Sequence, residues 1–262
     1  MQIAHVLNAR ASVFISWPGE LGITINQRDF LEIGGFPGVI RVVDGCLIKI
    51  SAPHENPDSY IDRKGHHSIN MQAIFDSRRR FIDVYAACPG SVNDARVWSL
   101  STINQESLRD YDRYFPEQTH ILGDKIYPVR FNLMPPFKGL RNLGPMELEY
   151  NRIHILTRQI IERAFALLLQ RFRRLKYLYL QDVAIASLII LACCCLHNVC
   201  ISLNDVLGEE EEMEQLLKEN GDDDNDDGGN GDLRGEDGNM QFPAILKRNI
   251  IAEQLYTIRR MQ

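Results

Sequence analysis

The sequence predicts an α/β fold in which strands occupy the first half of the chain and helices accumulate toward the C-terminus. Two observations support this prediction. Residues 39–123 contain short, β-branched, apolar runs that are separated by turn residues. Residues 150–203 contain no glycine or proline and are rich in leucine, isoleucine and alanine, which is typical of helices. With 262 residues, 45% of them hydrophobic, the chain is long enough to bury a large core.

Five short runs in the first half are the predicted strands. They are residues 39–43, 47–50, 69–75, 81–87 and 119–123. Asp44 and Gly45 separate the first two runs, and the polar turn DSRR joins the third and fourth as a hairpin. Asp124 closes the last strand. The predicted body is therefore a sheet whose strands are punctuated by acidic residues.

Helices are predicted between and after these strands. Ser91 is a candidate N-cap for a helix over residues 91–102, with Asp94 as an acid in its first turn. A long helical stretch covers residues 150–203, and the last 20 or so residues again have the spacing of an amphipathic helix. The three successive cysteines at 193–195 lie in an apolar run, where free cysteine packs as a small hydrophobe.

The net charge of −6 averages two very different regions. From Asp205 to Asp237, fifteen acidic residues accompany only two basic ones, which gives this segment a charge of −13 and leaves +7 on the rest of the chain. A mildly basic body permits a polyanionic partner. The longest apolar run, of 14 residues at 183–196, is shorter than the ~20 that span a bilayer, and the N-terminus lacks a signal-peptide pattern. We therefore expect a soluble, intracellular protein with no membrane association.

Three acids stand out by position as candidate metal ligands. Asp44 lies against an apolar strand, Asp124 closes another, and Glu162 lies on a predicted inward-facing stripe of the long helix. One interpretation of a buried Glu162 is a salt bridge to Arg158 or Arg163. The other is that all three carboxylates converge on Mg²⁺ or Mn²⁺, which prefer oxygen ligands and support in-line attack on a phosphodiester.

Several strings occur in one order along residues 36–198. They are GVIRVVDGCLIKISAP, YIDRKGHHSINMQAIFD, PGSVNDARVWSLS, ILGDKIYP, LMPPF, RQIIERAFALLLQRFRRL and CCCLHN. Together they resemble the DDE nuclease domain of the PIF/Harbinger transposase superfamily, specifically the Harbinger transposase-derived nuclease group. The resemblance makes Asp44, Asp124 and Glu162 the first, second and third catalytic acids and metal ligands, with Asp94 as a further candidate ligand or a helix-capping acid.

The resemblance also carries expectations about fold, activity and partners. It implies an RNase H-like mixed sheet flanked by helices, a divalent metal cofactor, and cleavage or transfer of DNA strands. The expected location is the nucleus, with the cytoplasm as an additional one, and the expected partners are DNA and a Myb/SANT-like protein; no oligomeric state is implied. A basic cluster after Glu162 suits phosphate contacts, with a solvated helix face as the alternative: Arg171, Arg173, Arg174 and Lys176.

With this resemblance, the chain divides into four predicted parts. They are a remnant of an N-terminal helical region at residues 1–35, the nuclease domain at 36–203, an acidic disordered insert at 204–239 and a C-terminal amphipathic helix at 240–262.

A second functional hypothesis is a catalytically inactive, domesticated copy that acts as a DNA- or protein-binding module. Lys125, Ala166 and Leu169 depart from the residues usual at these places in the family, and the region before the nuclease domain is short. Retention of all three acids favours the enzyme.

Overall fold

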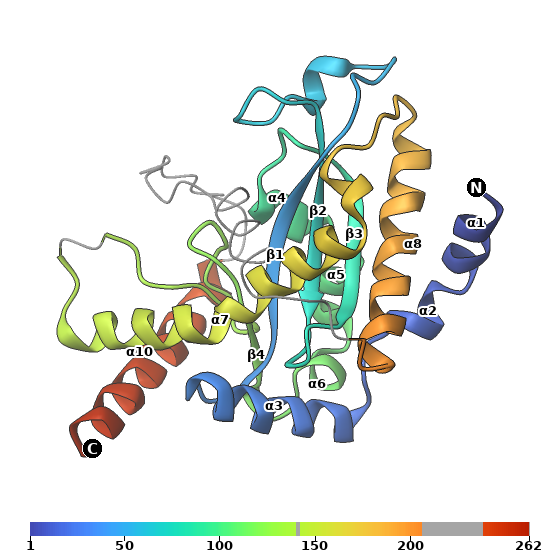
Figure 1. Cartoon of the computed structure of the whole chain (residues 1–262). Helices are drawn as coiled ribbons and strands as arrows, with labels where there is room; N and C mark the ends of the chain where they lie inside the picture. The colour runs from blue at the N-terminus through green and yellow to red at the C-terminus, as the bar shows by residue number, and fades with distance from the viewer. Residues whose placement is uncertain (140–141, 206–237, 262) are drawn as a thin grey trace.

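The computed structural model describes residues 1–139, 142–205 and 238–261. The acidic insert predicted at 204–239 lies almost entirely outside these described residues. The chain forms a mixed five-stranded sheet in the order β3-β2-β1-β4-β5, with helices on both faces (Figure 1). This is an α/β, RNase H-like arrangement, as the sequence predicts. The strands are β1 (Val39–Lys49), β2 (Ser68–Phe75), β3 (Phe81–Pro89), β4 (His120–Leu122) and β5 (Leu133–Met134).

The helices follow the predicted order, with most of the long ones in the second half. The α-helices are α1 (Gln2–Ala9), α2 (Ala11–Phe14), α3 (Glu20–Gly34), α4 (Asp94–Leu100), α5 (Thr102–Arg109), α6 (Tyr111–Tyr114), α7 (Pro145–Arg171), α8 (Val183–Ser202) and α10 (Gly238–Met261). The short 3₁₀ segments are η1 (Pro57–Tyr60), η2 (Pro116–Gln118) and η4 (Arg173–Lys176). Helices therefore also occupy most of the region before β1.

Two hydrophobic layers fix the sheet between the helices. On one face, sheet residues such as Val42 and Phe75 pack with α7, α8 and α10. On the other face, Val43 and Ile74 pack with α4, α5 and α6. Consecutive residues of a strand project to opposite faces, which is why neighbours such as Val42 and Val43 belong to different layers. The central strand β1 is thus covered on both sides.

The predicted hairpin is confirmed, whereas the predicted break in the first strand is wrong. β2 and β3 pair antiparallel on either side of the turn at 76–80. Asp44 and Gly45 do not interrupt β1, because β2 pairs with it continuously from Val42 to Lys49 and holds both residues in the ladder. Continuous pairing with β2 lets β1 tolerate an acid and a glycine that would end an isolated strand.

The helix after the hairpin begins later than its sequence signal suggests. Asn93, rather than Ser91, is the N-cap of α4, and its side chain accepts a hydrogen bond from Arg96 N–H. The Ser91 hydroxyl instead donates to the Ser59 carbonyl at 2.6 Å. Asp94 is the first residue of α4, so the prediction of an acid in the first turn is confirmed.

The long helical stretch predicted at 150–203 is in fact two helices. Between α7 and α8 the chain returns to the sheet, where Leu178 N–H donates to the Lys49 carbonyl at 2.8 Å and Ser51 N–H donates to the Leu178 carbonyl at 3.2 Å. Leu178 is buried in the core. This pairing with the end of β1 outweighs local helix propensity. Asp182 then caps α8 by accepting from Ile185 N–H.

By length and composition, α8 is the single helix among the described residues that is able to cross a membrane. In this fold it packs against β3, α1 and α2. His197 and Asn198 lie inside it, before its end at Ser202, and both side chains bond to neighbouring elements. Asn198 accepts from Phe81 N–H and donates to the Phe81 and Phe14 carbonyls, so it ties β3 and α2 to α8.

Candidate active site

Asp44 lies near the middle of β1, the central strand of the sheet. Its main chain is opposite Ala73 of β2, and its side chain is on the same face as Val42 and Ile48, toward α7. The carboxylate is partly buried, and its Oδ1 accepts a hydrogen bond from Gly45 N–H at 3.0 Å. The strand therefore holds this acid at a fixed place under α7.

Asp124 lies just beyond β4, which runs parallel to β1. The register pairs Val42 with Leu122, so two further residues along each strand bring Asp124 level with Asp44. The Oδ1 atom of Asp124 accepts a hydrogen bond from Ile126 N–H at 2.9 Å. The turn after β4 thus presents a second carboxylate beside the first.

The expectation that Glu162 is buried is wrong. The buried side of this part of α7 is formed by Thr157, Ile161, Ala164 and Leu168, and Glu162 is exposed. The true inward face is displaced from the predicted stripe because small and polar residues, which apolar counting undervalues, contribute to it. Glu162 still lies one helical turn after Arg158 and close to it in space.

Arg158 bonds one of the three acids and is affected by the charges of the other two. Its Nη2 donates to Asp44 Oδ2 at 2.6 Å, and the two side chains are 18% and 19% exposed. Burial opposes the charge on the guanidinium, yet the negative charges of Asp44, Asp124 and Glu162 raise the pKa of Arg158 above its ordinary value. Arg158 and Arg163 are the two arginines considered as partners for Glu162. The charges of all three acids act on Arg158, but the hydrogen bond of Arg158 goes to Asp44.

Asp94 lies near these acids but on the opposite face of β1. Its Oδ1 accepts a hydrogen bond from Asn70 Nδ2 at 2.7 Å. A Cβ atom on Gly45 would overlap the Asp94 carboxylate, so the absence of a side chain at 45 lets this acid approach the strand. Because Gly45 follows Asp44 in the strand, the backbone of β1 separates the two carboxylates.

Tyr127 is affected by the charges of acids on both faces of the sheet. Its hydroxyl accepts a hydrogen bond from Gln72 Nε2 at 3.1 Å. Burial, together with the charges of Asp94, Asp44 and Asp124, raises the pKa of Tyr127 well above its ordinary value, so the phenol keeps its proton.

Sequence reasoning missed Tyr127 and the two amides that serve this region, Asn70 and Gln72. A signal was present, because these amides are alternate residues of a strand that is buried throughout its length. Polar side chains at that spacing point to one face, where they need partners.

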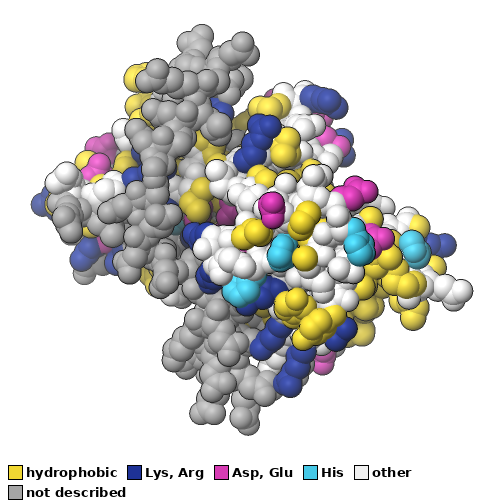
Figure 2. Space-filling model, turned by 90° about the horizontal axis from the view of Figure 1, so that it is seen from above, with side chains coloured by type: hydrophobic (Ala, Val, Ile, Leu, Met, Phe, Trp, Pro, Cys, Tyr) yellow, Lys and Arg dark blue, Asp and Glu magenta, His cyan; other side chains and the backbone are white. Residues whose placement is uncertain are grey.

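The predicted basic cluster divides into one largely buried residue and three exposed ones. The Arg171 side chain is 5% exposed and donates to His197 Nδ1 at 3.2 Å and to the Asp205 carbonyl at 2.8 Å. Arg173, Arg174 and Lys176 of η4 are exposed. Seen from above, Lys and Arg side chains occur at several places, with acids and histidines between them, rather than as one continuous basic surface (Figure 2).

Two of the departures from the family pattern are explained by packing. Ala166 and Leu169 are both buried, and Leu169 belongs to the main hydrophobic cluster. These two positions therefore serve the core of this chain. Lys125 is half-buried in the turn after β4.

The acids suit a divalent cation by the chemistry of their donor atoms. Carboxylate oxygens are the ligands that Mg²⁺ and Mn²⁺ prefer, and all three already act on one cation, Arg158. Within the part of the chain that the structure describes, however, no three His, Cys, Asp or Glu side chains are grouped so as to hold a metal ion. The carboxylates are therefore suitable metal ligands in kind, and the guanidinium of Arg158 lies beside them.

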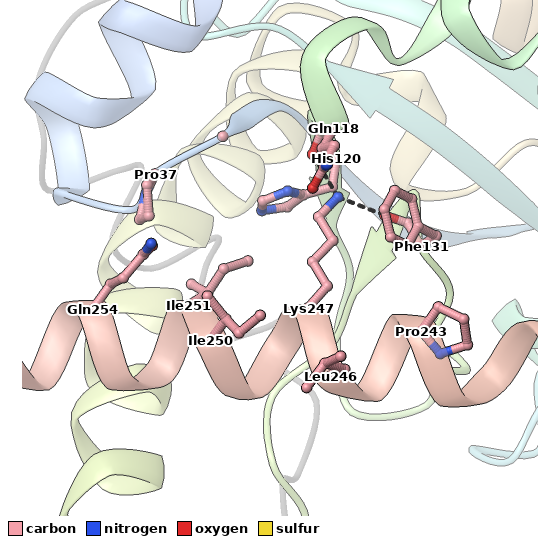
Figure 3. A pocket seen from close by; sticks show the side chains of 11 residues that line it. Pro37, Gln118, His120, Phe131, Pro243, Leu246, Lys247, Ile250, Ile251 and Gln254 are labelled. Carbon is pink, nitrogen blue, oxygen red and sulfur yellow. Dashed lines mark hydrogen bonds between the residues drawn. The ribbon is translucent and has the colours of Figure 1, made fainter.

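A second buried cation lies near the start of β1, where α10 covers the start of β4 (Figure 3). A cavity of about 370 Å³ is lined mainly by apolar residues of α10 and by Pro37, Phe131 and His120. Lys247 of α10 is buried here, and its Nζ donates to the carbonyls of Gln118 and Phe131 at 2.5 and 2.7 Å. This ammonium anchors α10 to the sheet.

The mixed five-stranded sheet flanked by helices is the fold of an RNase H-like domain. The chain matches the DDE superfamily endonuclease family over residues 43–198, a span that begins one residue before Asp44 and includes Asp124 and Glu162. It belongs to this family, as a Harbinger-derived DDE nuclease domain.

Several relatives carry informative names. Proteins named "Putative nuclease HARBI1" from Bos taurus and Homo sapiens are each 34% identical over 201 residues, which cover 75% of this chain and 56% of the relative. The protein named ALP1-like from Arabidopsis thaliana is 28% identical over 212 residues, which cover 76% of this chain and 51% of the relative. The chain thus spans about half the length of these relatives. No solved structure matches it significantly.

Proposed function

We propose that this chain is a divalent-metal-dependent DNA endonuclease derived from a Harbinger-type transposase, which hydrolyses or transfers phosphodiester bonds through Asp44, Asp124 and Glu162. The observation that carries the proposal is that all three acids act on one cation, Arg158. The charges of Asp124 and Glu162 act on the guanidinium that bonds Asp44, which supports a shared cation site where a divalent ion would meet carboxylate oxygens.

In this proposal each acid is held by a different element of the fold. Asp44 is held by the central strand, Asp124 by the turn after β4, and Glu162 by α7, so ligands from a rigid sheet meet a ligand from a helix. Mg²⁺ or Mn²⁺, when bound, supplies Lewis-acid stabilisation of phosphate oxygens and lowers the pKa of a bound water. The hydrogen bond from Gln72 to the protonated Tyr127 links β2 to the turn after β4.

DNA is the proposed substrate, and the three exposed cations of η4 are its proposed phosphate contacts: Arg173, Arg174 and Lys176. A Myb/SANT-like protein is the proposed partner, and the nucleus the proposed location. Fluorescence microscopy of the tagged chain, with and without co-expression of such a partner, tests both: we expect nuclear signal that increases with the partner.

Cleavage of supercoiled plasmid DNA tests the activity. We expect nicking in Mg²⁺ or Mn²⁺ that EDTA abolishes and that Asp44→Asn, Asp124→Asn and Glu162→Gln each reduce by at least about a thousandfold, because a metal contributes several kcal/mol. Asp58→Asn, which changes an exposed acid of η1, is the matched control and should cleave normally. Cleavage that persists in EDTA or in all three variants would exclude the proposed site.

One observation favours a second candidate function, a catalytically inactive DNA- or protein-binding module. Asp44 already holds an ion pair with Arg158, so the acids have a stabilising role without any metal. DNA binding by a folded protein with no metal-dependent cleavage, and with no effect of Asp124→Asn on DNA affinity, would support this module over the enzyme.

A further inference from the structure

The cavity under α10 shares no residue with the candidate active site. Its volume of about 370 Å³ lies in the range of small-molecule sites in proteins. Pro37 bounds it on the side of the chain before β1, and Leu246, Ile250 and Ile251 of α10 give it an apolar side (Figure 3). A cavity of this size and lining suits a small ligand with a short apolar chain.

One ammonium group, that of Lys247, lies in this apolar wall. Its Nζ donates to the carbonyls of Gln118 at 2.5 Å and Phe131 at 2.7 Å, and its contact with the Thr119 carbonyl is long, at 3.4 Å. One of its three N–H groups is therefore only weakly used. A buried cation is normally paired with a carboxylate, yet no acidic residue of the described chain lines the cavity.

His120 adds a second polar group whose bonding is incomplete. It is 1% exposed, and neither ring nitrogen has a partner in hydrogen-bonding geometry among the described residues. Gly38 lies against this ring, because a Cβ atom at position 38 would be 2.9 Å from its Cε1. Figure 3 shows the imidazole next to the Lys247 side chain on the cavity wall. The polar part of the wall therefore has capacity for an oxygen-bearing group.

We propose that this cavity binds a small aliphatic carboxylate, whose charged group pairs with Lys247 and whose chain packs against Pro37 and the isoleucines of α10. The carboxylate supplies the negative charge that the lining residues lack, and the neutral imidazole of His120 has an N–H to donate. Leu246 and Ile250 line the cavity although they are 50% and 46% exposed, so apolar surface extends to its opening.

Other classes of small ligand match this wall less well. A neutral alcohol or amide with the same chain leaves the Lys247 charge without a counter-charge, and a phosphate brings more charge than one ammonium offsets in an apolar cavity. The inference does not depend on nuclease activity, because the site contains none of Asp44, Asp124 and Glu162.

Calorimetric titration of the wild type with hexanoate and with hexanamide tests the proposal. We expect hexanoate to bind at least about tenfold more tightly, because the two probes share a chain and differ in charge. At pH 6 both partners are ionised, since burial lowers the pKa of Lys247 only to about 7 and carboxyl groups titrate near ~4. Equal affinities, or no binding of hexanoate at millimolar concentration, would overturn the proposal.

The variant Lys247→Met tests which group recognises the charge. We expect it to bind hexanoate no more tightly than hexanamide, because the ammonium is gone. Circular dichroism during heating checks that the variant is folded. A folded variant that still prefers hexanoate tenfold would overturn the role of Lys247.

A matched pair of substitutions keeps the proposal testable if Lys247→Met does not fold. Ile250 and Ile258 both belong to α10 and are 46% and 52% exposed, but of these two Ile250 lines the cavity. Ile250→Glu should lower the affinity for hexanoate relative to hexanamide at least about fivefold, because it places a negative charge beside the site, and Ile258→Glu should bind both probes as the wild type does. An equal change in the two variants, or no change in Ile250→Glu, would overturn the proposal.

Discussion

Two buried or nearly buried cations, Arg158 and Lys247, are stabilised in opposite ways. Arg158 lies among carboxylates, and their negative charges raise its pKa despite burial. Lys247 donates to the carbonyl oxygens of Gln118, Thr119 and Phe131, and burial lowers its pKa to about 7. Full charges hold a cation in its charged form, whereas carbonyl dipoles alone do not offset the loss of water.

The difference has a functional meaning. The acids around Arg158 favour positive charge, so this site holds a guanidinium in its charged form. The carbonyls around Lys247 belong to the backbone at the start of β4 and near β5, so this site is suited to dock a helix (Figure 3). Charge therefore joins a helix to a strand through carboxylates at β1, and it attaches a helix through backbone carbonyls at α10.

The largest expected effect concerns the bond between Arg158 and Asp44. In a double-mutant cycle with Arg158→Gln and Asp44→Asn, we expect a coupling free energy of about 2 kcal/mol, because the pair is largely shielded from water. Urea unfolding of the four proteins in EDTA measures it. The exposed pair Arg28 and Glu32, with side chains 66% and 71% exposed, is the control and should couple by less than about 0.5 kcal/mol. Equal coupling in the two cycles would contradict the account.

A smaller effect is expected in the pH dependence caused by Lys247. Its folded pKa of about 7 lies below the ~10.4 of an unfolded lysine, so between these values the unfolded chain binds more protons and stability rises with pH. Urea unfolding should show wild type gaining about 1.6 kcal/mol relative to Lys247→Met between pH 7 and 8.5. Below pH 6 the difference between the two proteins should be constant.

Its neighbour His120 does not obscure this measurement. Burial and the charge of Lys247 lower the pKa of His120 well below its ordinary value, so it stays neutral throughout this range. Parallel pH profiles for wild type and Lys247→Met would contradict the comparison.

The smallest effect on stability is expected for replacing a solvent-exposed arginine, Arg174. The exposed Arg174 lies over the Tyr179 ring, with its Cζ 4.9 Å from the ring centroid. Arg174→Gln should change the free energy of unfolding by less than about 0.5 kcal/mol. If η4 contacts phosphate, the same variant should weaken DNA binding and make it less salt-dependent, as fluorescence anisotropy would show. Unchanged DNA affinity would remove Arg174 from the proposed interface.

Much of the sheet was predictable because its signals are local. The hairpin of β2 and β3 combines two β-branched runs with a polar turn, and the acids at 44 and 124 are visible as interruptions of apolar runs. The strings around them also identify the family. The acidic insert cannot be compared, because residues 206–237 lie outside the described chain.

The remainder depended on contacts between residues far apart in the sequence. The turn between α7 and α8 forms because Leu178 pairs with the end of β1. The exposure of Glu162 depends on which side of α7 meets the sheet, and Thr157 on that side gives little apolar signal. Arg158 and Asp44 are 114 residues apart, so their bond is fixed only by the completed fold.

Anomalous diffraction from crystals of the wild-type protein grown with Mn²⁺ tests the central claim most directly. The account predicts Mn²⁺ bound to oxygens of Asp44, Asp124 and Glu162. Crystals with no manganese at bonding distance from any of the three acids would contradict it.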